Sequence, residues 1–265
     1  MENERVIYAC CPLCDSTSIA HLLAADCSRS PRYQPQLEGT IRWSKCDGCG
    51  HVFTEGYYTE QAQKVLFSTT DENQRPGAAL EKNRAMAARM IEKVLPYRDR
   101  GVWIDVGFGN GALLMTADEY GFDPVGLDLR EHNVIAMKLL GFECLNRDIG
   151  EFTYDKPAAV ISMADVLEHT PWPKQSLAAA YELLEPGGVI FLSMPNADSF
   201  LWKMASRQDA NPYWEEMEHY HNFGRQRLYD LLREIGFTPV RYGISERYRM
   251  CMEVIATKGP QLANS

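Results

Sequence analysis

The sequence predicts an α/β protein with a doubly wound, mostly parallel sheet, preceded by a small metal-binding module. Three observations lead to this prediction. From about residue 79 onward, apolar runs typical of buried strands alternate with segments of helical character. One of these runs leads directly into a glycine-rich turn, VGFGNG at 106–111. Finally, two C-x-x-C pairs lie within residues 11–49.

Length and composition limit the possible classes of protein. The chain has 265 residues, of which 45% are hydrophobic, so it can bury one large domain and a smaller one. No apolar run is long enough to span a membrane. The first residues, MENERVIYACC, lack the pattern of a signal peptide, so we expect a cytoplasmic protein. The net charge of −9 argues against a nucleic-acid partner.

The predicted domain boundary is the polar stretch TTDENQRPG at 69–77, which could also form a lid. We therefore assign residues 1–70 to the metal-binding module with its connector and residues 71–265 to the large domain. The last residues, GPQLANS, are expected to be frayed.

Within the large domain the expected elements follow one another in a regular order. The first helix is expected near 79–94. Strands are expected near 102–106, 124–128, 142–145, 158–163 and 188–194, and helices near 110–120, 131–139 and 173–184. Leucine and isoleucine at 228, 231, 232 and 235 have helical spacing, and Gly236 ends that helix. TPVRYGI and RMCMEVIAT then predict two closing strands.

The glycine-rich turn predicts a ligand site. Asp105 ends one strand, and Gly107, Gly109 and Gly111 follow it at alternate positions. Glycine lets a ligand lie against bare backbone, and the helix that begins near 110 offers N–H groups to a carboxylate. Asp128 ends the next strand and can accept the hydroxyls of a ribose. The expected ligand is a nucleoside with a small anionic part. A dinucleotide site usually has G-x-G-x-x-G, whereas this turn has G-x-G-x-G.

Motifs downstream of the turn favour one class of cofactor. ADVLEH at 164–169 is followed by LLEPGG at 183–188 and VIFLSMPN at 189–196. This succession resembles class I S-adenosylmethionine-dependent methyltransferases, in particular the branch with D-V-L-E-H, P-G-G and P-N segments. The resemblance covers roughly residues 79–258 and implies a Rossmann-like sheet with a C-terminal antiparallel hairpin.

The resemblance also implies which residues bind S-adenosylmethionine. Asp148 and Ile149 would lie beside the adenine, and Met163 and Ala164 near the methionine part. Phe108 departs from the small residue or cysteine that the family often has there. The expected set is Asp105, Gly107, Phe108, Gly109, Asn110, Gly111, Asp128, Leu129, Asp148, Ile149, Met163 and Ala164.

The cysteine pairs predict a structural zinc ion in a zinc-ribbon-like module. Cys11, Cys14, Cys46 and Cys49 supply the four soft ligands that tetrahedral zinc requires. The gap between the pairs is longer than usual, but it leaves room for a long hairpin, with IRWSKC as the returning strand. A redox dithiol and structural disulfides are the alternatives. Cys10 could replace Cys11 as the first ligand.

Three histidines are candidates for a general base that removes a proton from the methyl acceptor. His169 ends the D-V-L-E-H segment, and WEEMEHYHNF at 214–223, which contains His219 and His221, resembles the family's E-H-x-H-x-F segment. We rank His221 and His219 ahead of His169, because a histidine on a movable segment over the cleft can meet varied acceptors. For each, the alternative is a structural histidine.

The acceptor itself is expected to be a small molecule methylated on oxygen or carbon, such as a natural product or a sugar. No Asn/Asp-Pro-Pro-aromatic segment, typical of base amine methylation, follows the fourth strand, and no cysteine stands there.

Two alternatives stay open. The first is a ribosomal-RNA base methyltransferase with a zinc module, although residues 1–75 hold ten acids against seven bases. The second is a catalytically silent protein whose zinc module docks a partner. Nothing in the sequence determines the oligomeric state.

Overall fold

The computed structural model describes residues 4–30, 33–66 and 74–259 of the chain. These residues form two compact units, which are described separately below. The first unit is formed by the described residues within Met1–Thr70, Leu167–Lys174 and Pro195–Leu231, and the second by those within Asp71–Val166, Gln175–Met194 and Leu232–Ser265.

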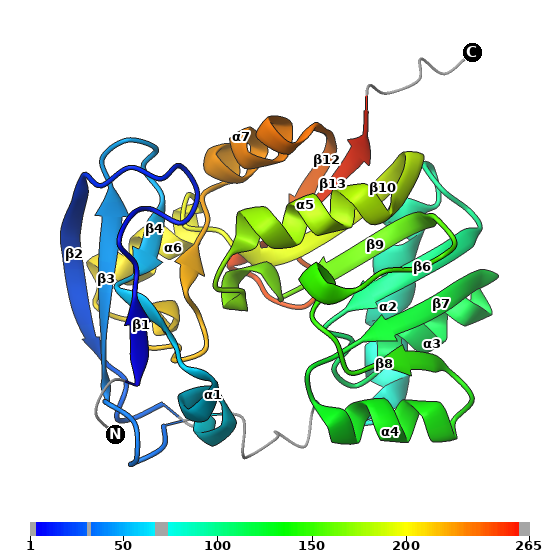
Figure 1. Cartoon of the computed structure of the whole chain (residues 1–265), viewed down its shortest axis with the longest axis horizontal. Coiled ribbons are helices and arrows are strands. Elements are labelled where there is room, and N and C mark those ends of the chain that lie inside the picture. The colour runs from blue at the N-terminus through cyan, green and yellow to red at the C-terminus, as the bar shows by residue number, and fades with distance from the viewer. Residues whose placement is uncertain (1–3, 31–32, 67–73, 260–265) are drawn as a thin grey trace. The chain divides into compact units, whose positions relative to one another are not determined.

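The second unit is built on a seven-stranded sheet, as far as the described residues extend, with the strand order β12-β13-β10-β9-β6-β7-β8 (Figure 1). Five adjacent strands run parallel to one another: β10, β9, β6, β7 and β8. β12 and β13 pair antiparallel to each other. The strands are β6 (Gly101–Val106), β7 (Phe122–Leu127), β8 (Glu143–Leu145), β9 (Ala158–Ala164), β10 (Leu184–Pro195), β12 (Phe237–Ile244) and β13 (Cys251–Lys258).

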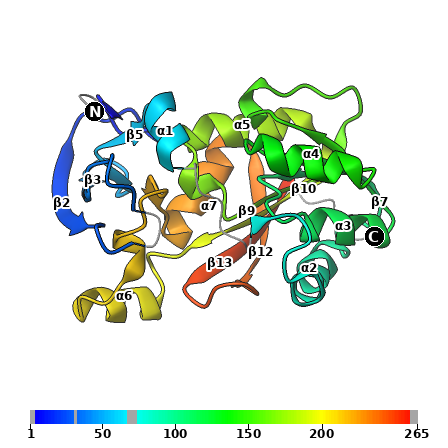
Figure 2. The same ribbon diagram turned by 90° about the horizontal axis from the view of Figure 1, so that it is seen from below.

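Helices cover both faces of this sheet, which makes it doubly wound. α2 (Leu80–Val94) and α3 (Ala112–Glu119) pack against each other on one face, and α5 (Pro173–Leu183) lies on the other (Figure 2). α4 (Glu131–Leu139) leads from β7 to β8, and α7 (Arg225–Ile235) precedes β12. Buried apolar residues of α2, α3 and the strands, including Ile91, Trp103 and Phe191, form the main core of the unit.

The first unit holds a four-stranded antiparallel sheet, again counting the described residues, with the order β11-β4-β3-β2. A separate antiparallel ribbon pairs β1 with β5. The elements are β1 (Arg5–Ile7), β2 (Ile19–Asp26), β3 (Thr40–Cys46), β4 (Val52–Thr54), β5 (Gly56–Tyr58), α1 (Glu60–Leu66), α6 (Phe200–Arg207) and β11 (His221–Asn222), with short 3-10 turns at Leu167–His169 and Pro212–Trp214. The long hairpin with IRWSKC as its returning strand is confirmed by the pairing of β2 with β3.

Residues distant in sequence complete the first unit. β11 pairs with β4, and the buried side chains of Met217 and Tyr220 pack with Trp43 and Tyr58. The indole N–H of Trp43 donates a hydrogen bond to the carbonyl of Trp214 at 2.9 Å. The segment 195–231, which the sequence analysis assigned to the large domain, therefore folds with the N-terminal segment. The predicted boundary at residue 70 lies outside the described residues and stays a prediction.

Most predicted elements of the second unit are confirmed. The strands expected near 102–106, 124–128, 142–145, 158–163 and 188–194 are β6 to β10, and the closing hairpin is β12 and β13. The helix expected from 110 begins only at Ala112, because Gly111 adopts a left-handed conformation as its N-cap. β10 begins earlier than expected, with a register shift between Leu184 and Val189. The tail from residue 260 lies outside the described residues. None of the helices described is both long and apolar enough to cross a bilayer.

Candidate functional site

The carboxyl ends of three adjacent strands bring the predicted cofactor residues to one edge of the sheet. Val106, the last residue of β6, is in register with Leu127 of β7 on one side and with Met163 of β9 on the other. Gly107, Asp128 and Ala164 therefore stand next to one another at this edge. In open α/β sheets such an edge is where ligands bind.

The glycine turn leaves a surface of bare backbone. Gly107, Gly109 and Gly111 all have positive φ angles, of 66°, 55° and 74°. A Cβ at Gly107 would lie 2.6 Å from Val166 Cγ2, so this glycine is required by packing. A Cβ at Gly109 would meet nothing closer than the Gly107 carbonyl at 3.9 Å. The space over Gly109 is thus open to a ligand, which a side chain there would occupy.

Asp128 is tied to this turn. One carboxylate oxygen accepts a hydrogen bond from the backbone N–H of Gly109 at 2.9 Å, and the other accepts from that of Arg130 at 2.8 Å. The buried Asn133 side chain donates to the Gly109 carbonyl at 3.0 Å. A carboxylate has about four lone-pair sites, so Asp128 can hold the turn and still accept ribose hydroxyls.

Asn110 closes part of the helix terminus beside the turn. Its side-chain oxygen accepts a hydrogen bond from the N–H of Ala112 at 3.1 Å. From the sequence, the N–H groups of this region are predicted to bind a carboxylate. Because the N–H of Ala112 already has a partner, an anion bound at this terminus needs donors other than that N–H.

Asp105 lies under the turn and is almost fully buried. The Ser162 hydroxyl donates to its carboxylate at 2.6 Å, and the Trp103 indole N–H donates to that hydroxyl at 2.8 Å. Burial raises the pKa of Asp105 to about 7, against the lowering effects of the Ser162 hydrogen bond and the charge of Arg247. Asp105 can therefore hold a proton or a cationic group at neutral pH.

A pocket opens between the turn, helix α2 and the loop that joins β12 to β13. Its lining includes Asn83, Met86, Asp105, Gly107, Ala164 and Arg247. Arg247 was not among the predicted site residues, because it is distant in the chain from the glycine turn and belongs to no recognised motif. Its only sequence signal is the charged stretch SERYR between two predicted strands.

The other predicted cofactor residues lie around this edge in different environments. Phe108 is buried with Leu114, Val134 and Met137 in a small apolar cluster. Ile149 is buried and Met163 fully so, whereas Leu129 is exposed. Asp148 caps a short turn by accepting a hydrogen bond from the N–H of Gly150 at 2.8 Å.

In the first unit, the four predicted zinc ligands come together. The Sγ atoms of Cys11, Cys14, Cys46 and Cys49 all lie within 4.8 Å of one another. Cys11 Sγ is 3.7 Å from Cys49 Sγ, and Cys14 Sγ is 3.5 Å from Cys46 Sγ. Tetrahedral zinc with bonds of about 2.3 Å requires sulfur atoms roughly 3.8 Å apart, so the spacing fits zinc. Cys10 is not part of this cluster.

His169 and His219 form a pair with Glu168. Ligand atoms of these three side chains lie within 4.8 Å of one another, and the two rings meet edge to face with centroids 4.6 Å apart. His169 Nδ1 lies 2.9 Å from the Glu218 carbonyl oxygen, which can only accept. Nδ1 therefore carries the proton, and Nε2 of the neutral ring is the basic nitrogen.

His221 has a different environment. Its Nε2 lies 3.0 Å from the Thr170 carbonyl oxygen and its Nδ1 3.0 Å from Nε2 of His51. The Thr170 contact places the proton on Nε2, so His51 donates to Nδ1. His221 is fully buried, and burial lowers its pKa to about 3. His221, the first-ranked candidate for the base, is therefore not on a movable segment as predicted but in β11, paired with β4.

Comparison with known proteins places this geometry in context. A family model described as "Methyltransferase domain" matches residues 79–242, more than half of the chain. The chain is 31% identical over 110 residues to a ubiquinone biosynthesis O-methyltransferase of Erwinia tasmaniensis, a match covering 38% of this chain and 45% of that protein. It is 34% identical over 101 residues to the enzyme of that name from Saccharophagus degradans, covering 35% and 43%. The chain thus spans less than half the length of these relatives.

Solved structures share the fold at lower identity. A 1,6-didemethyltoxoflavin-N1-methyltransferase of Burkholderia thailandensis, with S-adenosylhomocysteine bound, has a TM-score of 0.58 at 19% identity, covering 79% of this chain and 96% of that one. A magnesium protoporphyrin IX methyltransferase of Synechocystis, also with S-adenosylhomocysteine, has a TM-score of 0.52 at 14% identity, covering 77% and 90%.

Proposed function

Because this chain belongs to the methyltransferase-domain family, we propose that it transfers a methyl group from S-adenosylmethionine to an oxygen or carbon atom of a small molecule. The observation that carries the proposal is the glycine turn at the sheet edge. There, the Asp128 carboxylate holds the N–H of Gly109, and the neighbouring Gly107 and Asn110 line the pocket that contains Asp105.

The residues of this edge fit the parts of the cofactor. Asp128 would accept the ribose hydroxyls while it holds the turn through Gly109. Asp148 and Ile149 would border the adenine, and Asp105 would face the methionine ammonium group. When bound, the cofactor supplies the methyl group on a sulfonium. The protein then has to hold the acceptor in line and exclude water.

We propose that His169, with His219 beside it, is the general base. The Glu218 carbonyl fixes the tautomer of His169 so that Nε2 can accept a proton from the acceptor. The carboxylate of Glu168 lies within reach of both rings and would stabilise the imidazolium that forms. We assign His221 a structural role, because each of its ring nitrogens is engaged in a hydrogen bond inside the unit.

The cysteine cluster is proposed to hold one structural zinc ion. All four ligands would be protein thiolates, which leaves no position for water or substrate. Cys11 and Cys46 are buried beside the β2–β3 hairpin, so the ion would join the N-terminal turn to the second C-x-x-C turn. This role requires no contact with the acceptor.

A small-molecule acceptor is favoured for two reasons. The relatives that match in sequence are named for ubiquinone biosynthesis, and one structural neighbour is named for the small molecule 1,6-didemethyltoxoflavin. The chain is also acidic, with a net charge of −9, which opposes binding to a polyanion.

The proposal can be tested with the full-length protein, by following S-adenosylhomocysteine release in the presence of phenolic, sugar and heterocyclic acceptor pools and of ribosomal RNA. We expect turnover with a small-molecule pool, lost in the Asp128→Ala variant. Turnover with RNA alone would establish the ribosomal-RNA alternative. Tight cofactor binding without turnover on any pool would favour the catalytically silent alternative.

A further inference from the structure

From the pocket beside the glycine turn, we infer that Arg247 binds the α-carboxylate of the cofactor's methionine part. This inference rests on the proposed function and assigns a side chain to the carboxylate, for which the sequence predicted only backbone N–H groups at the start of α3. The methionine part is a zwitterion, with an ammonium and a carboxylate group on the same carbon. A pocket that binds it therefore needs one anionic and one cationic partner.

The pocket lining has that charge pattern. Among the described residues that line it, Asp105 is the acid and Arg247 is the base. The two charges already act on each other, because Arg247 opposes the rise in the pKa of Asp105 that burial causes. The N-terminus of α3, the other candidate for binding a carboxylate, has one of its N–H groups bonded to Asn110.

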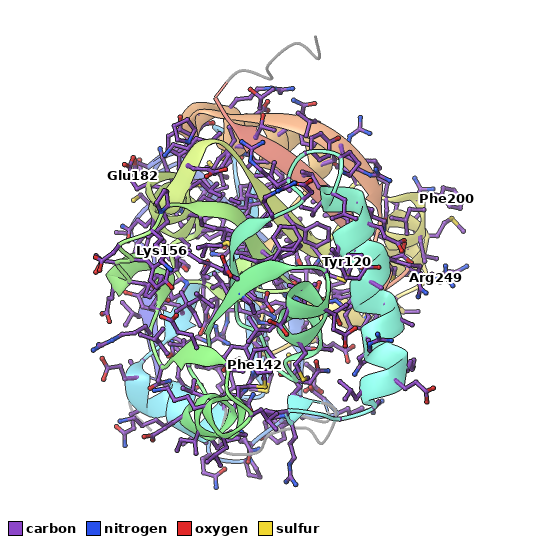
Figure 3. All side chains as sticks on the ribbon, turned by 90° about the vertical axis from the view of Figure 1, so that its right-hand side faces the viewer. Tyr120, Phe142, Lys156, Glu182, Phe200 and Arg249 are labelled. Carbon is purple, nitrogen blue, oxygen red and sulfur yellow. The ribbon has the colours of Figure 1, made fainter. Side chains whose placement is uncertain are left out.

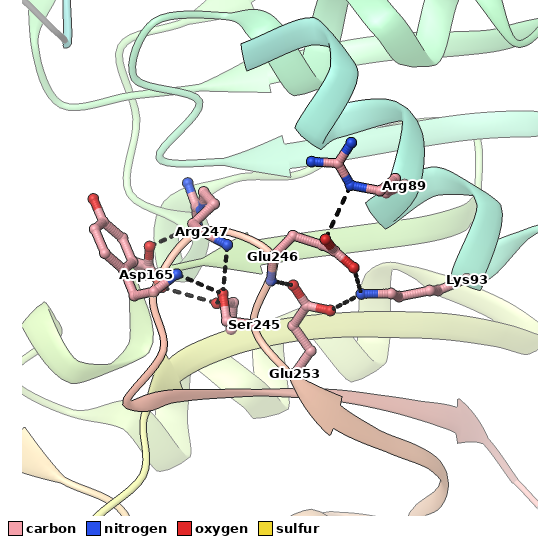
Figure 4. A network of polar contacts seen from close by, with 9 residues as sticks. Arg89, Lys93, Asp165, Ser245, Glu246, Arg247 and Glu253 are labelled. Atoms are coloured by element: carbon pink, nitrogen blue, oxygen red, sulfur yellow. Dashed lines mark hydrogen bonds and ion pairs between the residues drawn. The ribbon is translucent and has the colours of Figure 1, made fainter. Parts of the chain in front are cut away.

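The guanidinium is held in place by Asp165. Nη2 of Arg247 lies 2.8 Å from Oδ2 of Asp165, whose Oδ1 accepts a hydrogen bond from the Ser193 hydroxyl at 2.9 Å (Figure 4). Asp165 follows β9 directly and has a left-handed φ of 58°, a conformation that turns the chain at the ligand edge. A guanidinium has five N–H donors, so it can hold Asp165 and a second carboxylate together.

The loop that carries Arg247 is fixed to the helix that lines the same pocket. Glu246 accepts hydrogen bonds from Lys93 at 2.6 Å and from Arg89 at 3.0 Å, and both donors lie on α2 (Figure 4). Lys93 also contacts the buried Glu253 of β13 at 2.6 Å. These contacts and the Asp165 ion pair hold Arg247 in place, which lowers the cost of ordering its side chain when the carboxylate binds.

The test uses calorimetry on the full-length protein with two ligands. The first is S-adenosylhomocysteine, and the second is its decarboxylated analogue, 5′-(3-aminopropylthio)-5′-deoxyadenosine. For the native protein we expect the loss of the carboxylate to weaken binding about 10- to 100-fold, as for a charge-assisted hydrogen-bonded pair. For Arg247→Gln we expect S-adenosylhomocysteine to bind about 10- to 100-fold more weakly and the analogue to bind as it does to the native protein.

Two further variants control for folding and for general charge. Arg247→Lys keeps the charge but loses the planar fork, so it should lose less affinity than Arg247→Gln. Arg249→Gln removes an exposed arginine of the same loop, whose side chain points outward in Figure 3, and should bind both ligands as the native protein does.

Two results with Arg247→Gln would overturn the inference. In the first, the variant binds both ligands more weakly by the same factor. In the second, it binds S-adenosylhomocysteine with unchanged affinity. The first result would mean that Arg247 only maintains the pocket, and the second that another group holds the carboxylate. Failure of the native protein to bind either ligand would instead refute the cofactor assignment of the proposed function itself.

Discussion

The two compact units hold their functional groups in contrasting ways. In the second unit the cofactor edge is made chiefly of backbone, from the glycine turn and the ends of neighbouring parallel strands. In the first unit the two candidate centres, four cysteines and a histidine pair with a glutamate, are made of side chains from distant segments. A backbone site is encoded locally and can be recognised in a short motif. A side-chain site depends on which chain segments meet.

The two histidine environments make the same point within one unit. His219 and His221 are separated by a single residue, yet they join different partners: His219 meets His169, and His221 meets His51. In the first pair the Glu218 carbonyl fixes the tautomer of His169, whereas in the second pair His51 and the Thr170 carbonyl engage the two ring nitrogens of His221. Spacing in the sequence could not distinguish these roles, because it does not show that β11 begins at His221 and leaves His219 in the preceding loop.

Because the cysteine cluster is made of side chains that join distant segments, the largest effect should follow from breaking it. We expect Cys46→Ser to lose the zinc and, with it, on the order of 10 kcal/mol of metal-linked folding free energy of the first unit. Metal analysis and tryptophan fluorescence would measure this, because Trp43 and Trp214 belong to that unit. S-adenosylhomocysteine affinity should persist.

Cys10→Ser is the matched control for the zinc prediction, because Cys10 lies outside the cluster. It should retain stoichiometric zinc. A Cys46→Ser protein with native zinc content and native fluorescence would contradict the zinc assignment.

The next largest effect concerns acid stability. The pKa of His221 is about 3 in the folded chain, lowered by burial, and about 6.5 when unfolded. Between these values only the unfolded state binds the proton, so the free energy of unfolding falls as the pH drops from about 6.5 to 3. The full loss is about 5 kcal/mol. His221→Phe should reduce this pH dependence by about one proton.

Urea unfolding at a series of pH values would measure the acid effect. His21→Phe, which changes an exposed histidine of the same unit, should keep the native slope. If the free energy of unfolding of His221→Phe kept the native dependence on pH, His221 would not be buried in its neutral form. It would then again be a candidate for the general base.

A smaller effect, on the rate rather than the fold, is expected from the other pair. His169→Ala should lower methyl transfer about 10²- to 10⁴-fold without changing cofactor affinity. Single-turnover rates with the identified acceptor would measure it, and His21→Ala should remain at the native rate. Turnover within a few-fold of native in both His169→Ala and His219→Ala would show that proximity alone drives the transfer.

The smallest effect should come from the ribose contact. Asp128→Ala removes hydrogen bonds to a charged acceptor, each contributing about 1.5–3 kcal/mol before compensation. Part of the loss will reflect the turn, because Asp128 also holds Gly109. Calorimetry with S-adenosylhomocysteine would report it, and Asp123→Ala, an exposed acid at the other end of β7, serves as the control. Undiminished affinity would refute the assignment.

Sequence reasoning was most accurate where structure is local. The positions of β6 to β10, the closing hairpin and the meeting of four cysteines could all be predicted, because each depends on short patterns of apolar residues, glycine or cysteine. It failed for residues whose roles depend on tertiary contacts. Arg247 reaches the pocket through a loop fixed by Lys93. His221 is buried because β11 pairs with β4, and no local sequence pattern predicts that pairing.

The pairing of β11 with β4 has a consequence for synthesis on the ribosome. His51 and His221, which share a hydrogen bond, are 170 residues apart in the chain. At roughly 5–20 residues per second, the N-terminal strands emerge on the order of 10–30 s before the strand that completes their sheet. During this interval β4 has an unpaired edge. Early capture of zinc by the cysteine turns would hold the nascent hairpin in shape until its last strand arrives.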